Sequence, residues 1–394
     1  MTEKKEDELK SETELTNESV QETEKTVLND EKHNRAPFIH LTKRVGVTLK
    51  EAILVRAISI FAALIFCAIL IVIVTGLNPF SVYVTICQGA FGTGRGWVTL
   101  KNVALLLGVS LAVTPAFRMH FWNIGAEGQT LIGCLSTAVL LYLLHDKVHI
   151  AVLVILMVVS AVFVGALWGF IPAFFKAQWK TNETLFTLMM NYVAIQLVLF
   201  FANVATKNRY TTVSQELLGS GVPDLFGVQY LLIIIVVAIL TVALYIYLRY
   251  TKHGYEISVV GESENTARYI GINVKKVIIR TMILSGAICG LIGFLLVGCV
   301  GGPSLKEDSV GGRGFTAIMV SWLAKFDPLM MILTTLLIVF MARGADQIST
   351  LYELNMSFSE IITGILLFFI IGCEFFIRYR VHFNFRSEKG KECN

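Results

Sequence analysis

The chain of 394 residues is 55% hydrophobic and 16% charged, with a formal net charge of +4 at pH 7. A soluble domain has a smaller apolar share and about a quarter charged residues, so this composition excludes an ordinary soluble enzyme. The excess basic residues lie in the loops between apolar segments, which argues against a nucleic-acid-binding surface. Because a membrane-crossing helix needs about 20 largely apolar residues, we expect an all-α, polytopic integral membrane protein.

The N-terminal segment 1–42 is the most polar part of the chain. It contains 11 of the 29 acidic residues and 6 of the 33 basic ones, with almost no large apolar side chains. Such a composition is typical of disorder. We therefore predict a disordered acidic tail, which either is simply solvated or docks to a partner. No signal peptide is visible, so the first span should direct insertion.

The segment 43–380 is predicted to be the transmembrane domain, followed by a short tail at 381–394. About ten helices are expected, at 52–75, 98–117, 122–144, 148–175, 184–205, 229–248, 281–300, 314–326, 328–345 and 357–377. The stretch 314–326 is too short for a normal span. Interrupted segments in both parts of the chain favour two inverted halves of five crossings each, an arrangement found in transporters.

Basic residues indicate which loops lie in the cytoplasm. Arg118 follows the second predicted span, Lys176 the fourth and Arg249 the sixth, and more basic residues crowd 250–276 and the C-terminus. These positions predict that both ends of the chain are cytoplasmic and that 250–276 is a long cytoplasmic loop.

The sequence FWNIGAEGQT at 121–130 interrupts helical, apolar sequence with glycines, amides and a carboxylate. Irregular charged sequence at membrane depth is tolerated where it faces protein or water. We therefore predict that Trp122, Asn123, Glu127 and Gln129 line a substrate pathway. For Glu127, the alternatives are an internal hydrogen bond or ion pair, or proton coupling.

Two further residues are candidates for the pathway. Asn191 lies within a span, where an asparagine either contacts a ligand or bonds another helix. Phe315, like Trp122, is next to an interruption and could stack on a flat ring of a ligand, although aromatic residues near span ends also act as interfacial anchors. Arg313, beside a glycine-rich turn, could meet a partner protein or membrane lipid phosphate. Glu183 is expected to cap a helix.

The long loop predicts one short helix. Ser263 can cap a helix that starts at Glu264, with Ala267 and Ile270 on one face and Gly271 as its left-handed stop. Such a short helix is marginal alone, so its apolar face should press against the membrane domain or another subunit. The alternative is an ordinary connecting loop.

The chain has no sequence signature of a cofactor or metal site. Its seven cysteines form no CxxC pair, and no cysteine–histidine cluster has metal spacing. There is no GxxxxGK[ST] phosphate loop, so ATP-driven transport would need a separate ATPase chain. The histidines are scattered, which argues against a membrane-embedded transferase.

Four segments, in order, carry a family resemblance: FWNIGAEGQTLIG, TNETLFTLMMNYVA, GESENTARYIGINVKK and GFTAIMVSWLAKFDPL. They resemble the permease subunits of ATP-binding-cassette (ABC) importers for nucleosides and simple sugars, particularly the nucleoside branch. Two features depart from the family pattern. Trp122 precedes Asn123, and Lys325 and Asp327 stand where the family has mostly small apolar residues.

The resemblance implies a permease that forms the translocation pathway for nucleosides in a bacterial plasma membrane and performs no chemistry. Its expected partners are a second permease, ABC ATPase subunits and an extracellular lipid-anchored substrate-binding protein. It implies that the cytoplasmic loop couples the chain to the ATPases, through Gly254, Glu256, Gly261, Ala267, Arg268 and Gly271. The alternatives are a simple-sugar permease of the same architecture and an ion-coupled secondary transporter.

Overall fold

The computed structural model describes residues 39–43, 49–76, 78–92, 94–145, 147–219, 221–223, 227–228, 230–300, 302–353 and 356–383. The chain divides into two compact units, one formed by Met1–Leu64 with Phe368–Asn394 and the other by Ile65–Leu367. Most of the two predicted tails, 1–38 and 384–394, lies outside the described residues.

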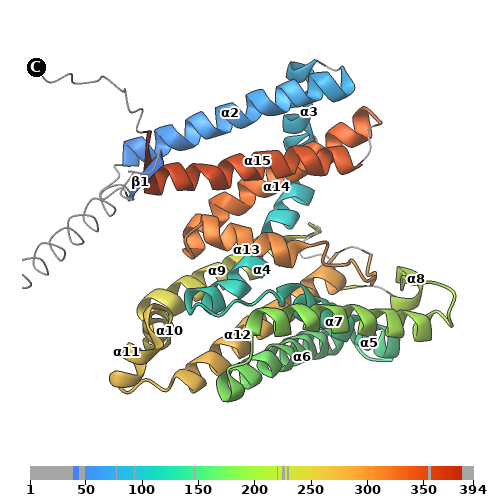
Figure 1. Cartoon of the computed structure of the whole chain (residues 1–394). Coiled ribbons are helices and arrows are strands. Elements are labelled where there is room, and N and C mark those ends of the chain that lie inside the picture. Colours follow the sequence, from blue (N-terminus) through green and yellow to red (C-terminus); the bar gives the residue numbers. More distant parts are fainter. Residues whose placement is uncertain are drawn as a thin grey trace, which may run out of the picture. The chain divides into compact units, whose positions relative to one another are not determined.

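The protein is helical, as predicted (Figure 1). Its elements are β1 (Ile39–Lys43), α2 (Leu49–Thr75), α3 (Pro79–Phe91), α4 (Gly96–Arg118), α5 (Ala126–Leu144), α6 (Ile150–Trp179), α7 (Glu183–Ala205), α8 (Gln215–Leu218), α9 (Leu231–Tyr250), α10 (Lys252–Glu262), α11 (Glu264–Tyr269), α12 (Val274–Gly298), α13 (Arg313–Leu323), α14 (Pro328–Leu351), α15 (Met356–Arg378) and β2 (Tyr379–Phe383). Within the described ranges, eight helices are long and apolar enough to cross a membrane.

The smaller unit contains a two-stranded ribbon that the sequence did not predict. β1 pairs with β2 in antiparallel register, with Ile39 opposite Phe383 and Lys43 opposite Tyr379. The predicted domain boundaries at 42 and 381 fall inside these strands. Because the two strands lie at opposite ends of the chain, their pairing leaves no local pattern.

The larger unit is built around α12, which packs against α4, α5 and α6. In Figure 1, α5, α6, α7 and α12 lie side by side. Glycines permit this close packing. A Cβ on Gly133 of α5 would lie 2.6 Å from the Gly290 carbonyl oxygen, and one on Gly290 would collide with the Ala161 carbonyl oxygen of α6. The backbones of three helices therefore meet at Gly290.

Replacing Gly290 with valine should destabilise the larger unit by about 1 to 3 kcal/mol, the usual cost of overpacking, because the backbone of α6 leaves no room for the side chain. Thermal unfolding of the purified protein in detergent measures the effect. Gly364→Val in α15 is the matched control, since nothing lies within 4 Å of a Cβ there. Equal unfolding temperatures for the two variants would contradict the packing argument.

The predicted interruptions are present, and three helices were missed, α3, α10 and the four-residue α8. α4 ends at Arg118 and α5 begins at Ala126, and α13 has only 11 residues. α3 was not predicted, although Asn78 before a proline is a helix-start signal and its side chain accepts a bond from the Phe80 N–H. α10 was missed because glycine has poor helix propensity, whereas here Gly254 and Gly261 are buried against other elements.

Candidate functional site

The segment 119–125 between α4 and α5 is fixed by buried amides. Asn123 is fully buried and Gln129 is 1% exposed. The Asn123 Nδ2 lies 3.2 Å from the Gln129 Oε1 and 3.3 Å from the Ser285 Oγ of α12, and the Asn123 Oδ1 accepts a bond from the Gly125 N–H at 3.1 Å. These two predicted pathway residues therefore hold the interruption against the middle of α12.

Helix α7 holds the same interruption from another side. The Asn191 Oδ1 accepts a bond from the Gly128 N–H at 2.9 Å, and its Nδ2 donates to the Ile124 carbonyl at 3.0 Å. The Thr187 Oγ1 accepts a bond from the Ile124 N–H at 3.2 Å. Asn191 is 4% exposed, so in this structure it makes the helix-to-helix bonds that the sequence offered as the alternative to ligand contact.

Glu127 joins the two interrupted segments of the chain. Its Oε1 accepts a bond from the Gly312 N–H at 2.9 Å, and its Oε2 accepts one from the Gly314 N–H at 2.6 Å. The carboxylate thus lies in the first turn of α5 and at the N-terminus of α13, and a negative charge is favourable at both positions. In this structure Glu127 makes the internal hydrogen bonds that the sequence left open as one of three roles.

The start of α13 fits tightly against α5 and α4. A Cβ on Gly314 would lie 2.7 Å from the Glu127 Cα, so only glycine lets the two backbones approach this closely. Arg313 donates to the Val310 carbonyl at 2.6 Å and to the Asn102 Oδ1 of α4 at 3.2 Å. The N-terminus of α13 is therefore fixed on two helices.

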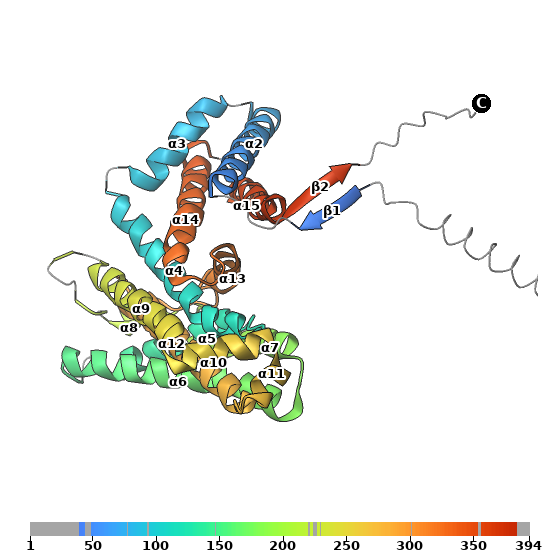
Figure 2. The same ribbon diagram turned by 90° about the vertical axis from the view of Figure 1, so that its left-hand side faces the viewer.

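From this anchor, α13 runs beside α4. The Ser321 Oγ donates to the Ser110 carbonyl at 3.1 Å, and the Phe117 and Phe326 rings stack with centroids 6.5 Å apart. In Figure 2, α13 lies beside α4 and α14. α5 and α13 thus both begin inside the bundle, and their N-termini meet at Glu127.

The aromatic candidates differ from the polar ones, because they are exposed. Trp122 is 41% exposed and Phe315 is 44% exposed. The structure adds Trp322, which is 50% exposed and whose ring centroid lies 5.4 Å from that of Trp122. Sequence reasoning missed Trp322, although it lies seven residues after Phe315 and so on the same helical face.

The long loop contains two helices instead of one. The predicted helix is confirmed as α11, because the Ser263 side chain accepts a bond from the Thr266 N–H at 3.2 Å, Ala267 is fully buried and Gly271 has a φ of +84°. Ile270 was expected on the packed face but is 50% exposed. It follows the last helical residue, so the helical periodicity no longer decides where it points.

The six loop residues predicted for coupling divide into buried and exposed ones. Gly254, Gly261 and Ala267 are buried in the fold. Glu256 pairs with Arg280 of α12 at 2.9 Å and so ties α10 to the bundle. Arg268 is exposed and pairs with Glu264 one turn earlier at 3.2 Å. Gly271 is exposed after the helix.

Gly261 connects α10 to the interruption after α4. A Cβ at this position would collide with the Arg118 carbonyl oxygen and lie 3.3 Å from the Met119 Cα. Arg118 is the last residue of α4, and Met119 begins the segment that contains Trp122 and Asn123. A displacement of α10 would therefore act directly on the interrupted segment.

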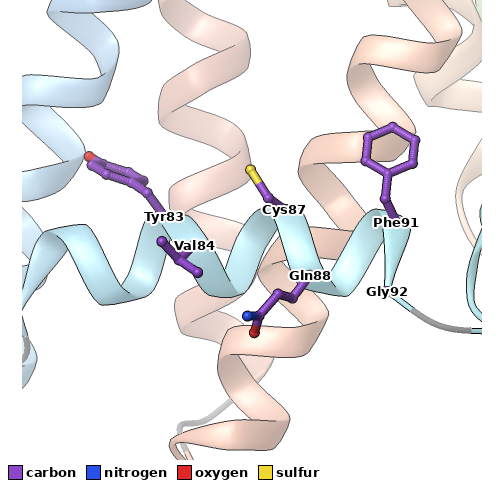
Figure 3. A pocket seen from close by; sticks show the side chains of 6 residues that line it. All are labelled: Tyr83, Val84, Cys87, Gln88, Phe91 and Gly92. Carbon is purple, nitrogen blue, oxygen red and sulfur yellow. The ribbon is translucent and has the colours of Figure 1, made fainter.

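The larger unit has two surface hollows of note. One, of about 250 Å³, lies between the ends of α4 and α9 and the turn before α14, and its lining includes Arg118, Arg249, Lys325 and Asp327. Another, of about 440 Å³, lies along α3, as Figure 3 shows, and none of the predicted pathway residues lines it. The two charged residues that depart from the family pattern, Lys325 and Asp327, thus line the first hollow.

The described residues contain no group of three or more histidine, cysteine, aspartate or glutamate side chains that could hold a metal ion. The arrangement of the helices points to a different function. Helices that begin inside a polytopic bundle, next to irregular backbone, are characteristic of membrane transport proteins. This fold and site therefore define a transport subunit.

Comparison with known proteins gives the family. Residues 95–371 match the model of the permease component of the branched-chain amino acid transport system, and the chain belongs to this family. It is a multi-pass membrane permease and not an enzyme.

Three relatives cover much of the chain. The guanosine ABC transporter permease of Bacillus subtilis is 28% identical over 82% of this chain and 93% of its own length. The nucleoside ABC transporter permease of Lactococcus lactis is 26% identical over 81% of this chain and 90% of its own. A glucose ABC transporter permease of Haloferax volcanii is 28% identical over 72% of this chain and 77% of its own.

Proposed function

We propose that this chain is the permease subunit of an ABC importer that carries nucleosides across a bacterial plasma membrane, with both termini in the cytoplasm. The similarity to two nucleoside permeases over four-fifths of this chain carries the proposal. Its partners are a second permease, ABC ATPase subunits and an extracellular lipid-anchored binding protein. The glucose permease supports simple sugars as the second candidate cargo.

Transport would proceed by alternating access, driven by the ATPases. They would push on α10 and α11, and the contact of Gly261 with the end of α4 would pass this motion to the segment 119–125. Glu127 would carry the motion on to α13 through its bonds to Gly312 and Gly314. The contiguous chain of contacts from α10 to α13 supports this route.

The exposed residues around α11 would form the ATPase docking surface. Tyr269 of α11 is 92% exposed, its neighbours Arg268 and Ile270 are exposed as well, and Tyr255 of α10 is 62% exposed. Aromatic side chains and arginine are enriched in protein interfaces. The two tyrosines were not singled out in the sequence, although a large aromatic residue in a polar loop is a recognisable signal.

In this proposal the predicted pathway residues have two kinds of role. Trp122 and Phe315 are exposed and line the path. Asn123, Gln129 and Asn191 are buried, and they shape the path by holding its backbone, as does Glu127.

The cargo is tested by ATP-driven uptake of radiolabelled uridine into proteoliposomes that contain the complete complex and its binding protein. Unlabelled nucleosides should compete and simple sugars should not. If glucose or ribose competed and nucleosides did not, the cargo would be a simple sugar instead. Uptake that persists without ATP but collapses with an uncoupler would favour an ion-coupled transporter.

Arg268→Glu should abolish uptake, because it reverses a charge on the proposed docking surface without touching the core. Capture of nucleoside by the binding protein should stay unchanged, as equilibrium binding measures. Arg209→Glu is the matched control, since Arg209 is also exposed but follows α7, away from the loop. Loss of both uptake and capture, or of neither, would contradict the assigned role.

A further inference from the structure

We propose that Trp122 and Trp322 form a stacking platform for the nucleobase of the cargo. This inference rests on the proposed nucleoside cargo and adds the chemical group that the permease itself would contact. A flat aromatic ring offers a base a large contact that does not depend on its hydrogen-bonding pattern.

The first argument is that the polar side chains of the interruption are already hydrogen-bonded to protein groups. Asn123, Gln129 and Asn191 are 0%, 1% and 4% exposed, and all of them bond protein groups. Both oxygens of Glu127 accept backbone N–H groups. In this arrangement the surface of the interrupted segments offers a ligand aromatic rings, not amides.

The second argument is the geometry of the two indoles. Their centroids lie 5.4 Å apart with an interplanar angle of 37°, so the rings form an open angle and do not stack flat on each other. Each is braced by a phenylalanine, Trp122 by Phe117 at 5.7 Å and Trp322 by Phe326 at 6.2 Å, both edge to face. Nearly half of each tryptophan remains exposed despite these braces.

The third argument is the location of the pair. Trp122 belongs to the irregular segment that follows Arg118, the charged last residue of α4. Trp322 lies near the end of the half-helix α13, three residues before Lys325, which lines the charged hollow with Arg118 and Asp327. Charged groups at the edge of the platform indicate access to water.

Trp97 shows what an ordinary anchor looks like in this chain. It lies in the first turn of α4 and is 48% exposed. No ring contact is recorded for it within the described residues, whereas the indole of Trp122 contacts two other rings. An interfacial anchor needs only one end in water and one in lipid, so Trp97 provides a control of the same residue type and similar exposure.

The test uses the complete reconstituted complex with its binding protein. Uptake of uridine and of guanosine is measured for Trp322→Leu, for Trp122→Leu with Trp322→Leu, for Trp322→Phe and for Trp97→Leu, together with ATP hydrolysis. Loss of base stacking should lower the uptake of both nucleosides about tenfold in the leucine variants. Trp322→Phe, which keeps a flat ring, should retain most of the rate, and Trp97→Leu should match the unaltered protein.

Equal uptake by the leucine variants and the unaltered complex would overturn the platform, and so would an equal loss in Trp322→Phe. If the unaltered complex transports no nucleoside at all, the proposed function fails first, so the two failures are distinguishable. Should a leucine variant fail to assemble, the unaltered complex is irradiated with 5-iodouridine, which couples to aromatic rings that it stacks on. Adducts should map to Trp122 or Trp322, and adducts confined to other segments would reject the proposal.

Discussion

Replacing Glu127 with alanine is expected to abolish uptake and to loosen the larger unit. The substitution removes the acceptor of two backbone N–H groups, those of Gly312 and Gly314, at the start of α13. An unsatisfied buried donor costs about 1 to 3 kcal/mol, and the favourable charge at two helix N-termini is lost as well. We expect α13 to detach from α5, so the two interrupted segments no longer move together.

Two measurements are needed, uptake of radiolabelled uridine and thermal unfolding of the purified complex. Glu216→Ala is the matched control, because Glu216 is an exposed carboxylate in α8 with no such role. Glu127→Gln should be intermediate, since the amide keeps one oxygen acceptor but turns an NH₂ group toward the other N–H. If the Glu127→Gln variant were as inactive in uptake as Glu127→Ala but unfolded at the same temperature as the unaltered complex, proton coupling would explain the role of Glu127 better.

Replacing Gly261 with valine is expected to uncouple ATP hydrolysis from transport. The new side chain cannot fit against the Arg118 carbonyl at the end of α4, so α10 must move away from the interrupted segment. Inserting a larger side chain into such a filled interior contact costs free energy of folding. Uptake should fall about tenfold or more, because α10 contacts the end of α4 directly, with no residue between them. The variant should still bind the ATPase subunits through the exposed face of α11.

The experiment compares uptake, ATP hydrolysis and co-purification of the ATPase for Gly261→Val and for Glu262→Val. Glu262 is the next residue on α10 but is exposed, so the control shares the helix and the introduced side chain. Normal uptake by Gly261→Val would show that the force does not pass through this contact. Loss of ATPase binding would instead assign Gly261 to the docking of the two subunits.

Much of the helical framework follows from apolar runs and start signals. The start of α7 illustrates this, because Glu183 lies in its first turn as expected, and the side chain of the preceding Asn182 provides the cap by accepting bonds from the Thr184 and Leu185 N–H groups. The interruption at 119–125 was predictable because glycines and polar groups break a membrane span. α10 was not predicted, since its glycines oppose a helix locally, and packing against α4, α9 and α12 stabilises it.

The roles of individual polar residues could not be read from the sequence. Asn123, Asn191 and Glu127 were singled out because polar residues are unusual in membrane spans, but a polar side chain there satisfies the same energetic need by bonding a ligand or by bonding the protein. In the structure these three bond protein groups. Their partners lie up to 187 residues away in the chain, and no local pattern specifies such a distance.

The sequence by itself determined that this is a multi-spanning helical membrane protein with two interruptions and a long polar loop that contains a helix, because burial in lipid forces long apolar runs and makes every departure from them visible. Only the tertiary structure decided that the interruptions meet at Glu127, that Gly261 rests on the end of α4, and that Trp322 lies beside Trp122. Those contacts join segments far apart in the chain, and they depend on how closely backbones approach, which residue composition alone does not specify.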